Sequence, residues 1–209
     1  MTLSPEQALV HHKSQLKACR QCEQMTGPPV TCGAGLSNIL LVGQAPGDKE
    51  PKFGRPFAWT AGKTLFKWFA SIGLNEAVFR EHVYMAAVCR CFPGKNPKGG
   101  DRIPNQDEIT RCSTWLRQEV LYLQPELLLP VGKLAITQFM SFNRLTEVIG
   151  QTHDICYAGR KMQAIPLPHP SGLSTWYRTE PGKTLLHQAL ALIHQHPTWQ
   201  QVMLMQQSS

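Results

Sequence analysis

Two short segments rich in glycine, proline and polar residues each follow an apolar run, and both carry side chains that could act on a ligand. The first is Gly43-Gln44-Ala45-Pro46-Gly47, continued by Gly54-Arg55-Pro56-Phe57, and the second is His169-Pro170-Ser171-Gly172-Leu173-Ser174. A histidine between two prolines has a restricted backbone, which suits a side chain that must hold one orientation. Backbone donors, an amide, an imidazole and an aromatic ring together predict the walls of a ligand pocket.

The cysteines form a second group that could carry chemistry. There are seven, an odd number in a chain without an apolar signal core, which argues against a disulfide framework and towards metal or thiol chemistry. Cys19 and Cys22 form the one C-x2-C pair, and the others lie at 32, 89, 91, 112 and 156. Four thiolates could hold a zinc ion or a [4Fe-4S] cluster, and spacing alone does not separate these from each other or from free thiols.

The apolar runs and their spacing predict one α/β domain with a central, mostly parallel sheet and helices on both faces. We expect strands over 38–42, 83–88 and 127–132, and a hairpin over 151–166 that turns at Ala158-Gly159-Arg160. Helices are expected over about 4–22, 60–72, 105–123, 133–142 and 180–196. The domain would comprise an N-terminal helix and cysteine-bearing loop (1–37), the α/β core (38–196) and a polar tail (197–209). In such sheets ligands bind beyond the carboxyl ends of the strands, where both pocket segments belong.

Bulk properties narrow the class of partner. The 209 residues carry a formal net charge of +7, which favours a polyanion, because lysine and arginine that neutralise phosphates release counterions. The stretch 92–104 is a basic loop rich in proline and glycine. No apolar run reaches the ~20 residues of a membrane span, so we expect a cytoplasmic protein without a membrane partner.

In order and spacing, these motifs resemble the uracil-DNA glycosylase superfamily, and within it the family 4 enzymes that carry an iron-sulfur cluster. The similarity runs from Cys19 to the final helix. The resemblance implies a monomeric DNA repair enzyme whose partner is DNA containing uracil or another deaminated base. Such an enzyme flips the base into its pocket and hydrolyses the N-glycosidic bond, leaving an abasic site.

The resemblance also implies roles for individual residues. His169 would donate to the departing base as negative charge develops on it, and Phe57 would stack on the base. Leu173 would fill the space that the flipped base leaves. The full set comprises the catalytic residues His169, Gln44 and Asp48, the base-binding residues Gly43, Ala45, Phe57 and Ala87, and the DNA-binding residues Ser171, Gly172, Leu173, Ser174 and Arg178. Glu50 is a further acid that could orient water, and Lys95, Lys98 and Arg102 of the basic loop would grip phosphates.

Two positions depart from the family 4 pattern. Gln44 stands where these enzymes usually carry glutamate, and Ala87 stands where they carry an asparagine that reads the uracil edge. Alanine cannot make that bidentate contact, so the departure predicts tolerance for other deaminated bases.

The cluster ligands implied by the resemblance are Cys19, Cys22, Cys91 and Cys112. Cys89 competes with Cys91, because both lie in Cys89-Arg90-Cys91. The family places its ligand directly before the residue that precedes a proline, which here favours Cys91 before Phe92-Pro93.

Two alternatives remain. One is a lesion-binding protein that keeps the fold and pocket but has lost turnover. The other is a nucleotide-binding loop at Gly62-Lys63-Thr64 or Gly182-Lys183-Thr184, which is disfavoured because the required upstream glycine is replaced by Phe57 and Tyr177.

Overall fold

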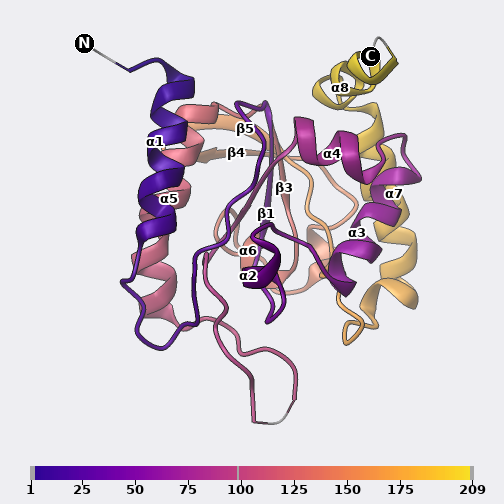
Figure 1. The fold of residues 1–209 in the computed structure, drawn as a ribbon. Coiled ribbons are helices and arrows are strands. Elements are labelled where there is room, and N and C mark those ends of the chain that lie inside the picture. Colours follow the sequence, from indigo (N-terminus) through magenta and orange to yellow (C-terminus); the bar gives the residue numbers. More distant parts are fainter. Residues whose placement is uncertain (1–2, 98, 208–209) are drawn as a thin grey trace.

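The computed structural model describes residues 3–97 and 99–207, and within them five strands form one sheet (Figure 1). The spatial order is β2-β1-β3-β5-β4, and only the β4–β5 pairing is antiparallel. β1 and β3 are buried along their whole length, as expected for strands covered on both faces. The strands are β1 (Ile39–Gly43), β2 (Tyr84–Ala87), β3 (Leu127–Pro130), β4 (His153–Tyr157) and β5 (Arg160–Ala164).

Helices cover both sides of this sheet, which confirms the predicted architecture. Figure 1 shows α1 and α5 on one side and α3, α4, α7 and α8 on the other. The helices are α1 (Pro5–Ala18), α2 (Glu50–Phe53), α3 (Thr60–Ala70), α4 (Glu76–His82), α5 (Gln106–Leu123), α6 (Lys133–Ile136), α7 (Gly182–Gln195) and α8 (Pro197–Gln207), with 3-10 turns η1 (Leu145–Glu147) and η2 (Trp176–Arg178). None of the helices in the described ranges is long and apolar enough to span a membrane.

Local capping signals set the starts of the two helices that flank the cysteines. Ser4 caps α1 and Asn105 caps α5, each through a capping box with the residue three positions later. α1 ends at Ala18, so Cys19 and Cys22 lie in the loop after it, whereas Cys112 lies inside α5. The first two cysteines are therefore carried by a loop and the last by a helix.

Several predicted boundaries differ from the structure, and two short helices were not expected. The expected polar tail over 197–209 is instead helix α8 as far as Gln207, and residues 208–209 lie outside the described part. Trp199 is fully buried and its indole N–H donates to the carbonyl of Ile72 at 3.2 Å, so one apolar face holds this otherwise polar segment on the domain. The helix expected over 133–142 ends at Ile136, and the short helices α2 and α4 were not foreseen.

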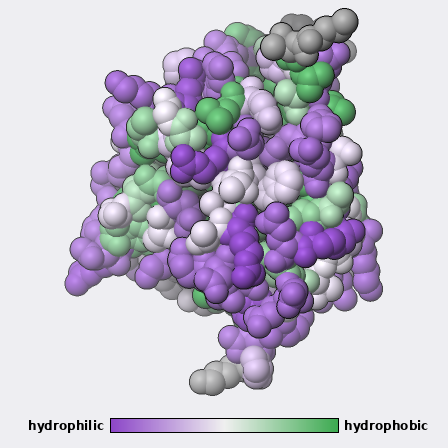
Figure 2. Space-filling view, turned by 90° about the vertical axis from the view of Figure 1, so that its left-hand side faces the viewer, coloured by the Kyte–Doolittle hydropathy of each residue, from purple (hydrophilic) through white to green (hydrophobic). Residues whose placement is uncertain are grey.

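The basic loop projects from the body of the molecule beyond the carboxyl ends of the strands (Figure 1). Figure 2 views the molecule from the side of α1 and α5, where hydrophilic side chains predominate and the same projection extends from the lower edge. The loop therefore stands at the end of the sheet where the pocket segments lie.

Candidate active site

A cleft of about 480 Å³ opens beyond the carboxyl ends of β1 and β3. The sheet brings its walls together, because Val131 donates to the carbonyl of Val42 and Gly132 donates to that of Leu167. Both predicted pocket segments line this cleft, joined by part of the basic loop. The lining includes Gly43, Gln44, Ala45, Asp48, Glu50, Phe57, Trp59, Lys95, Asp101, His169, Ser171, Gly172 and Leu173.

His169 is held in one orientation and in one tautomer. The backbone N–H of Ser171 donates to its Nδ1 at 3.3 Å, so Nδ1 is an acceptor and the ring proton of the neutral imidazole lies on Nε2. A Cβ on Gly132 would lie 2.9 Å from the His169 ring, so glycine at this position lets the ring lie against the turn between β3 and α6. Burial lowers the pKa of His169 below its usual 6.5, and the charge of Asp101 partly opposes that shift. The ring is therefore neutral at neutral pH and offers an N–H donor.

Phe57 occupies a strained backbone position that its neighbours enforce. Its φ is 52°, in the left-handed region that a bulky residue rarely adopts. Arg80 donates to the carbonyls of Pro56 at 2.9 Å and Phe57 at 3.0 Å. A Cβ on Gly43 would lie 2.9 Å from the Phe57 ring, and one on Gly62 would lie 1.8 Å from its carbonyl oxygen. Two glycines and one arginine thus fix the aromatic wall of the cleft.

The two acids of the first segment have different surroundings. Both carboxylate oxygens of Glu50 face inward and accept from the backbone N–H groups of Gly47 at 2.6 Å and Ala58 at 3.1 Å. Burial raises the pKa of Glu50, and these hydrogen bonds oppose the shift. Asp48 lies 3.5 Å from Lys95 across the cleft. The Glu50 carboxylate therefore holds the two ends of this loop together, whereas the Asp48 carboxylate faces Lys95 across the cleft.

Most, but not all, of the remaining predicted residues line the cleft. Leu173 is 81% exposed at its mouth, and a Cβ on Gly100 of the basic loop would lie 3.1 Å from Leu173 Cδ1, so the two loops meet there. Ser174 and Arg178 are outside the lining, and Arg178 stacks over the ring of Tyr177. Ala87 faces a separate small cavity of about 30 Å³ that it shares with Gly43 and Phe57.

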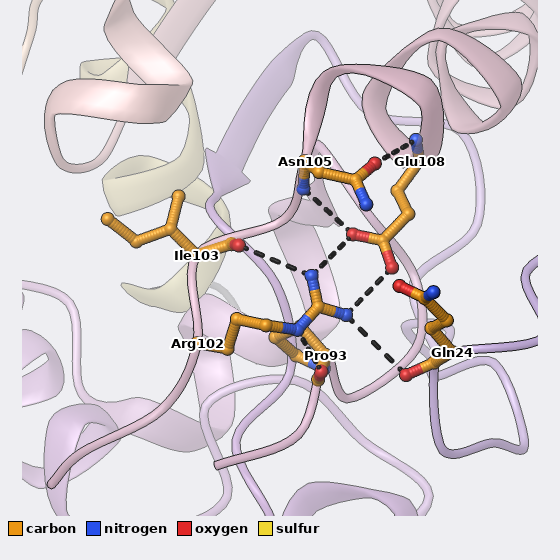
Figure 3. Close-up of polar contacts among 6 residues, drawn as sticks. All are labelled: Gln24, Pro93, Arg102, Ile103, Asn105 and Glu108. Carbon is orange, nitrogen blue, oxygen red and sulfur yellow. Dashed lines mark hydrogen bonds and ion pairs between the residues drawn. The ribbon is translucent and has the colours of Figure 1, made fainter. Parts of the chain in front are cut away.

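Arg102 fastens the basic loop to the body of the protein and is not a free phosphate ligand (Figure 3). It makes a bidentate pair with Glu108, at 2.7 and 2.8 Å, and donates to the carbonyl of Pro93 at 2.7 Å. Glu108 in turn accepts from the backbone N–H of Asn105 at the start of α5. Lys95 is paired with Asp101 at 2.7 Å, and Lys98 lies outside the described residues.

The four predicted metal-binding cysteines line one cavity of about 230 Å³ between the end of α1, the start of the basic loop and α5. Met25, Trp115 and the fully buried Arg90 complete part of its wall. Burial raises the pKa of Cys91 to about 12, and the neighbouring thiolates of Cys112, Cys19 and Cys22 add to that rise. Among the described residues, no three His, Cys, Asp or Glu side chains gather closely enough to hold a single metal ion.

Cys89 and Cys91 differ in what they face. Cys91 lines the cysteine cavity, whereas Cys89 is fully buried and absent from that lining. A hydrogen bond from Cys89 lowers the pKa of Cys112 to about 6. Cys89 therefore interacts with Cys112, which lines the cavity, but does not line the cavity itself.

The two Gly-Lys-Thr sequences have packing roles. Gly62 lies in α3 against the carbonyl of Phe57, and a Cβ on Gly182 at the start of α7 would lie 2.0 Å from the carbonyl oxygen of Trp176. Because glycine has no side chain, each of these positions lets another backbone segment approach closely. This packing role accounts for both glycines without a phosphate-binding loop.

Comparison with known proteins decides the family. A sequence model of the uracil DNA glycosylase superfamily matches residues 30–192. The chain belongs to this superfamily. It is 30% identical over 168 residues to the Type-4 uracil-DNA glycosylase of Archaeoglobus fulgidus, which covers 76% of this chain and 79% of the relative. A Type-4 uracil-DNA glycosylase of Sulfurisphaera tokodaii is also 30% identical over 168 residues, covering 76% and 72%. The Type-5 uracil-DNA glycosylase of Pyrobaculum aerophilum is 30% identical over 182 residues, covering 80% and 78%. The predicted superfamily is therefore confirmed.

Proposed function

We propose that this protein is a DNA glycosylase that hydrolyses the N-glycosidic bond of uracil, and of other deaminated bases, in DNA. The observation that carries the proposal is the neutral, oriented His169 facing the same cleft as Phe57. The names of its Type-4 relatives support uracil as a substrate. A base inside a duplex cannot reach such a cleft, so the target nucleotide would be flipped out of the stack.

His169 would supply the electrostatic part of the reaction. As the glycosidic bond breaks, negative charge develops on the base, and a fixed N–H donor stabilises that charge without reorganisation. Nε2 is the donor because Nδ1 accepts from Ser171. Burial keeps the ring neutral, and the neutral tautomer with its proton on Nε2 is the form whose Nδ1 can accept from Ser171.

Asp48 is the acid best placed to orient the attacking water. Both acids line the cleft, but both oxygens of Glu50 accept from backbone N–H groups, whereas the Asp48 carboxylate pairs with the lysine side chains of Lys49 and Lys95 at 3.7 and 3.5 Å. Gln44 lies beside it in the lining and can hydrogen-bond either water or base.

Leu173 would act as the wedge that fills the gap in the base stack. Its side chain is 81% exposed, and its contact with Gly100 supports it from the basic loop. Ser171 and Gly172, in the same lining, would meet the adjacent backbone. Ser174 and Arg178 lie beyond the cleft and would reach phosphates further along the strand.

The base range follows from Ala87. It carries no hydrogen-bonding side chain, and it faces the small cavity behind Phe57 and not the main cleft. Base selection would then rest on Gln44 and backbone groups, which can meet the edges of several deaminated bases.

A panel of duplexes and single strands containing uracil, hypoxanthine or xanthine, scored for abasic sites, tests the function. We expect release of uracil and of at least one deaminated purine. Binding to these oligonucleotides without release of any base would instead identify a lesion-binding protein.

The cysteine cavity would hold a [4Fe-4S] cluster. Four thiols around one cavity match the ligand set of that cluster, and sulfurs bound to different irons need not converge on one point. When bound, the cluster would tie α1, the basic loop and α5 together beside the cleft.

Replacing Arg80 with alanine is expected to lower base excision about tenfold, because the loss of roughly 1.4 kcal/mol in transition-state binding corresponds to that factor. Arg80 does not line the cleft, but it holds the backbone of Phe57 in its strained conformation. Excision rate and KM on a uracil-containing strand would measure the effect. Arg80→Lys should recover only part of it, because lysine cannot serve two carbonyls with a planar fork. The exposed Arg117→Ala is the control, and equal activity of Arg80→Ala and the control would contradict this role.

A further inference from the structure

Two aromatic side chains stand exposed beside the cleft and have no part in the reaction described above. Phe53, the last residue of α2, is 51% exposed, and Trp59, just before α3, is 48% exposed. Among the described residues, no other phenylalanine or tryptophan side chain is exposed. Their rings stack with centroids 6.0 Å apart and planes inclined by 21°.

The pair is built as a fixed surface. Gly54, with φ of 64°, turns the chain sharply after α2, which lets Phe53 meet Trp59 only six residues later. The carboxylate of Glu50 accepts from the N–H of Ala58, so the start of α2 is tied to the residue before Trp59. A preformed platform loses little conformational freedom when a ligand stacks on it.

Charge around the pair points to a nucleic acid. The segment 49–63 carries four cations and a single acid, and that acid, Glu50, faces inward. Lys52, Arg55 and Lys63 are exposed, and no ion pair or hydrogen bond joins their side chains to any described residue. Trp59 also lines the cleft itself, so the platform continues the surface that the flipped base would enter.

We propose that Trp59, supported by Phe53, stacks an unpaired nucleobase that flanks the target nucleotide, and that the protein consequently prefers single-stranded DNA to duplex. This inference rests on the proposed function, because that function determines how the DNA strand would enter the cleft. An aromatic platform with nearby cations is how proteins bind single strands without reading sequence, because every base has a face that can stack. Paired bases in a duplex already stack on their neighbours and cannot use it.

Binding of an undamaged oligothymidylate of about 12 nucleotides, at one salt concentration, tests the proposal. We expect Trp59→Ala to weaken binding about tenfold, as for the loss of one base–aromatic stack, and Phe53→Ala to weaken it less. The duplex of the same sequence should lose less affinity than the single strand. Leu121→Ala, which removes an exposed apolar side chain on α5, is the matched control and should bind as the wild type does.

A conservative variant separates stacking from general damage. Trp59→Phe should retain binding to within about threefold but lose the quenching of tryptophan fluorescence that accompanies binding of the wild type. Equal affinity of wild type and Trp59→Ala for the single strand would overturn the proposal and leave the pair as a surface for a protein partner. A larger loss on duplex than on single strand would also overturn it. The oligonucleotide contains no excisable base, so these outcomes are independent of whether the protein excises uracil.

Discussion

Replacing His169 with alanine is expected to reduce the excision rate about 100-fold to 1,000-fold, the effect of removing one preorganised donor from an anion-stabilising site. Nε2 is the donor that the cleft offers in a fixed orientation, since Nδ1 is taken by Ser171. Single-turnover release of uracil from a labelled strand measures the chemical step directly. KM should change little, because the charge that His169 meets develops only as the bond breaks.

Controls distinguish this role from a structural one. His169 packs against Gly132, so thermal unfolding must show that the variant is folded. His187→Ala, which removes an exposed histidine on α7, should leave excision unchanged. A His169→Ala protein that is folded and releases uracil at the wild-type rate would contradict the assignment.

The pH profile supplies a second readout of the same residue. The neutral ring is the form that the Ser171 N–H holds in place, because a proton on Nδ1 would break that contact, and burial lowers the pKa of His169 below 6.5. The neutral form therefore persists as the pH falls to 6.5 and is lost only as the pH falls through the lowered pKa. The wild type should lose activity on that acid side, and the residual activity of His169→Ala should lack this limb.

Replacing Cys112 with alanine is expected to abolish binding of the proposed iron-sulfur cluster and to lower the melting temperature by about 10 °C, as for a loss of roughly 4 kcal/mol in a chain of this size. Cys112 lies on α5 and lines the same cavity as the cysteines of the loop after α1, so the proposed cluster would join that helix to the loop. Without the cluster this corner would keep a cavity lined by thiols. Iron and sulfide content, visible absorbance and thermal unfolding measure the outcome.

Cys89 provides the matched control for this experiment. Cys89→Ala removes a buried thiol that does not line the cavity, so the purified protein should keep its colour and iron content. Cys91→Ala should lose both. The reverse result, with iron retained in Cys91→Ala and lost in Cys89→Ala, would exchange the two assignments, and a colourless wild type containing zinc would refute the cluster.

The sequence pattern was sufficient to predict those strands and helix starts that depend on neighbouring residues alone. The runs that become β1 and β3 are apolar throughout and bounded by glycine or proline, because strands buried on both faces need no polar alternation. The starts of α1 and α5 follow from capping residues a few positions apart. α8 was missed although it carries five apolar residues, because Leu204 and Met205 are exposed and the packing of Trp199 and Val202 on the domain exists only in the folded protein.

For the candidate site, the sequence by itself determined which segments line the cleft and the cysteine cavity: the two pocket segments, and the C-x2-C pair with Cys91 and Cys112. Only the tertiary structure decided how each side chain is used. In the folded protein the Glu50 carboxylate accepts from a backbone N–H, Arg102 pairs with Glu108, and Ala87 faces the small cavity behind Phe57. The tertiary structure also brought Arg80 to a carbonyl 23 residues away and placed Cys91, but not Cys89, on the cavity. Residue type and spacing specify what a group can do, whereas its partners come from distant parts of the chain and are set by how the elements pack.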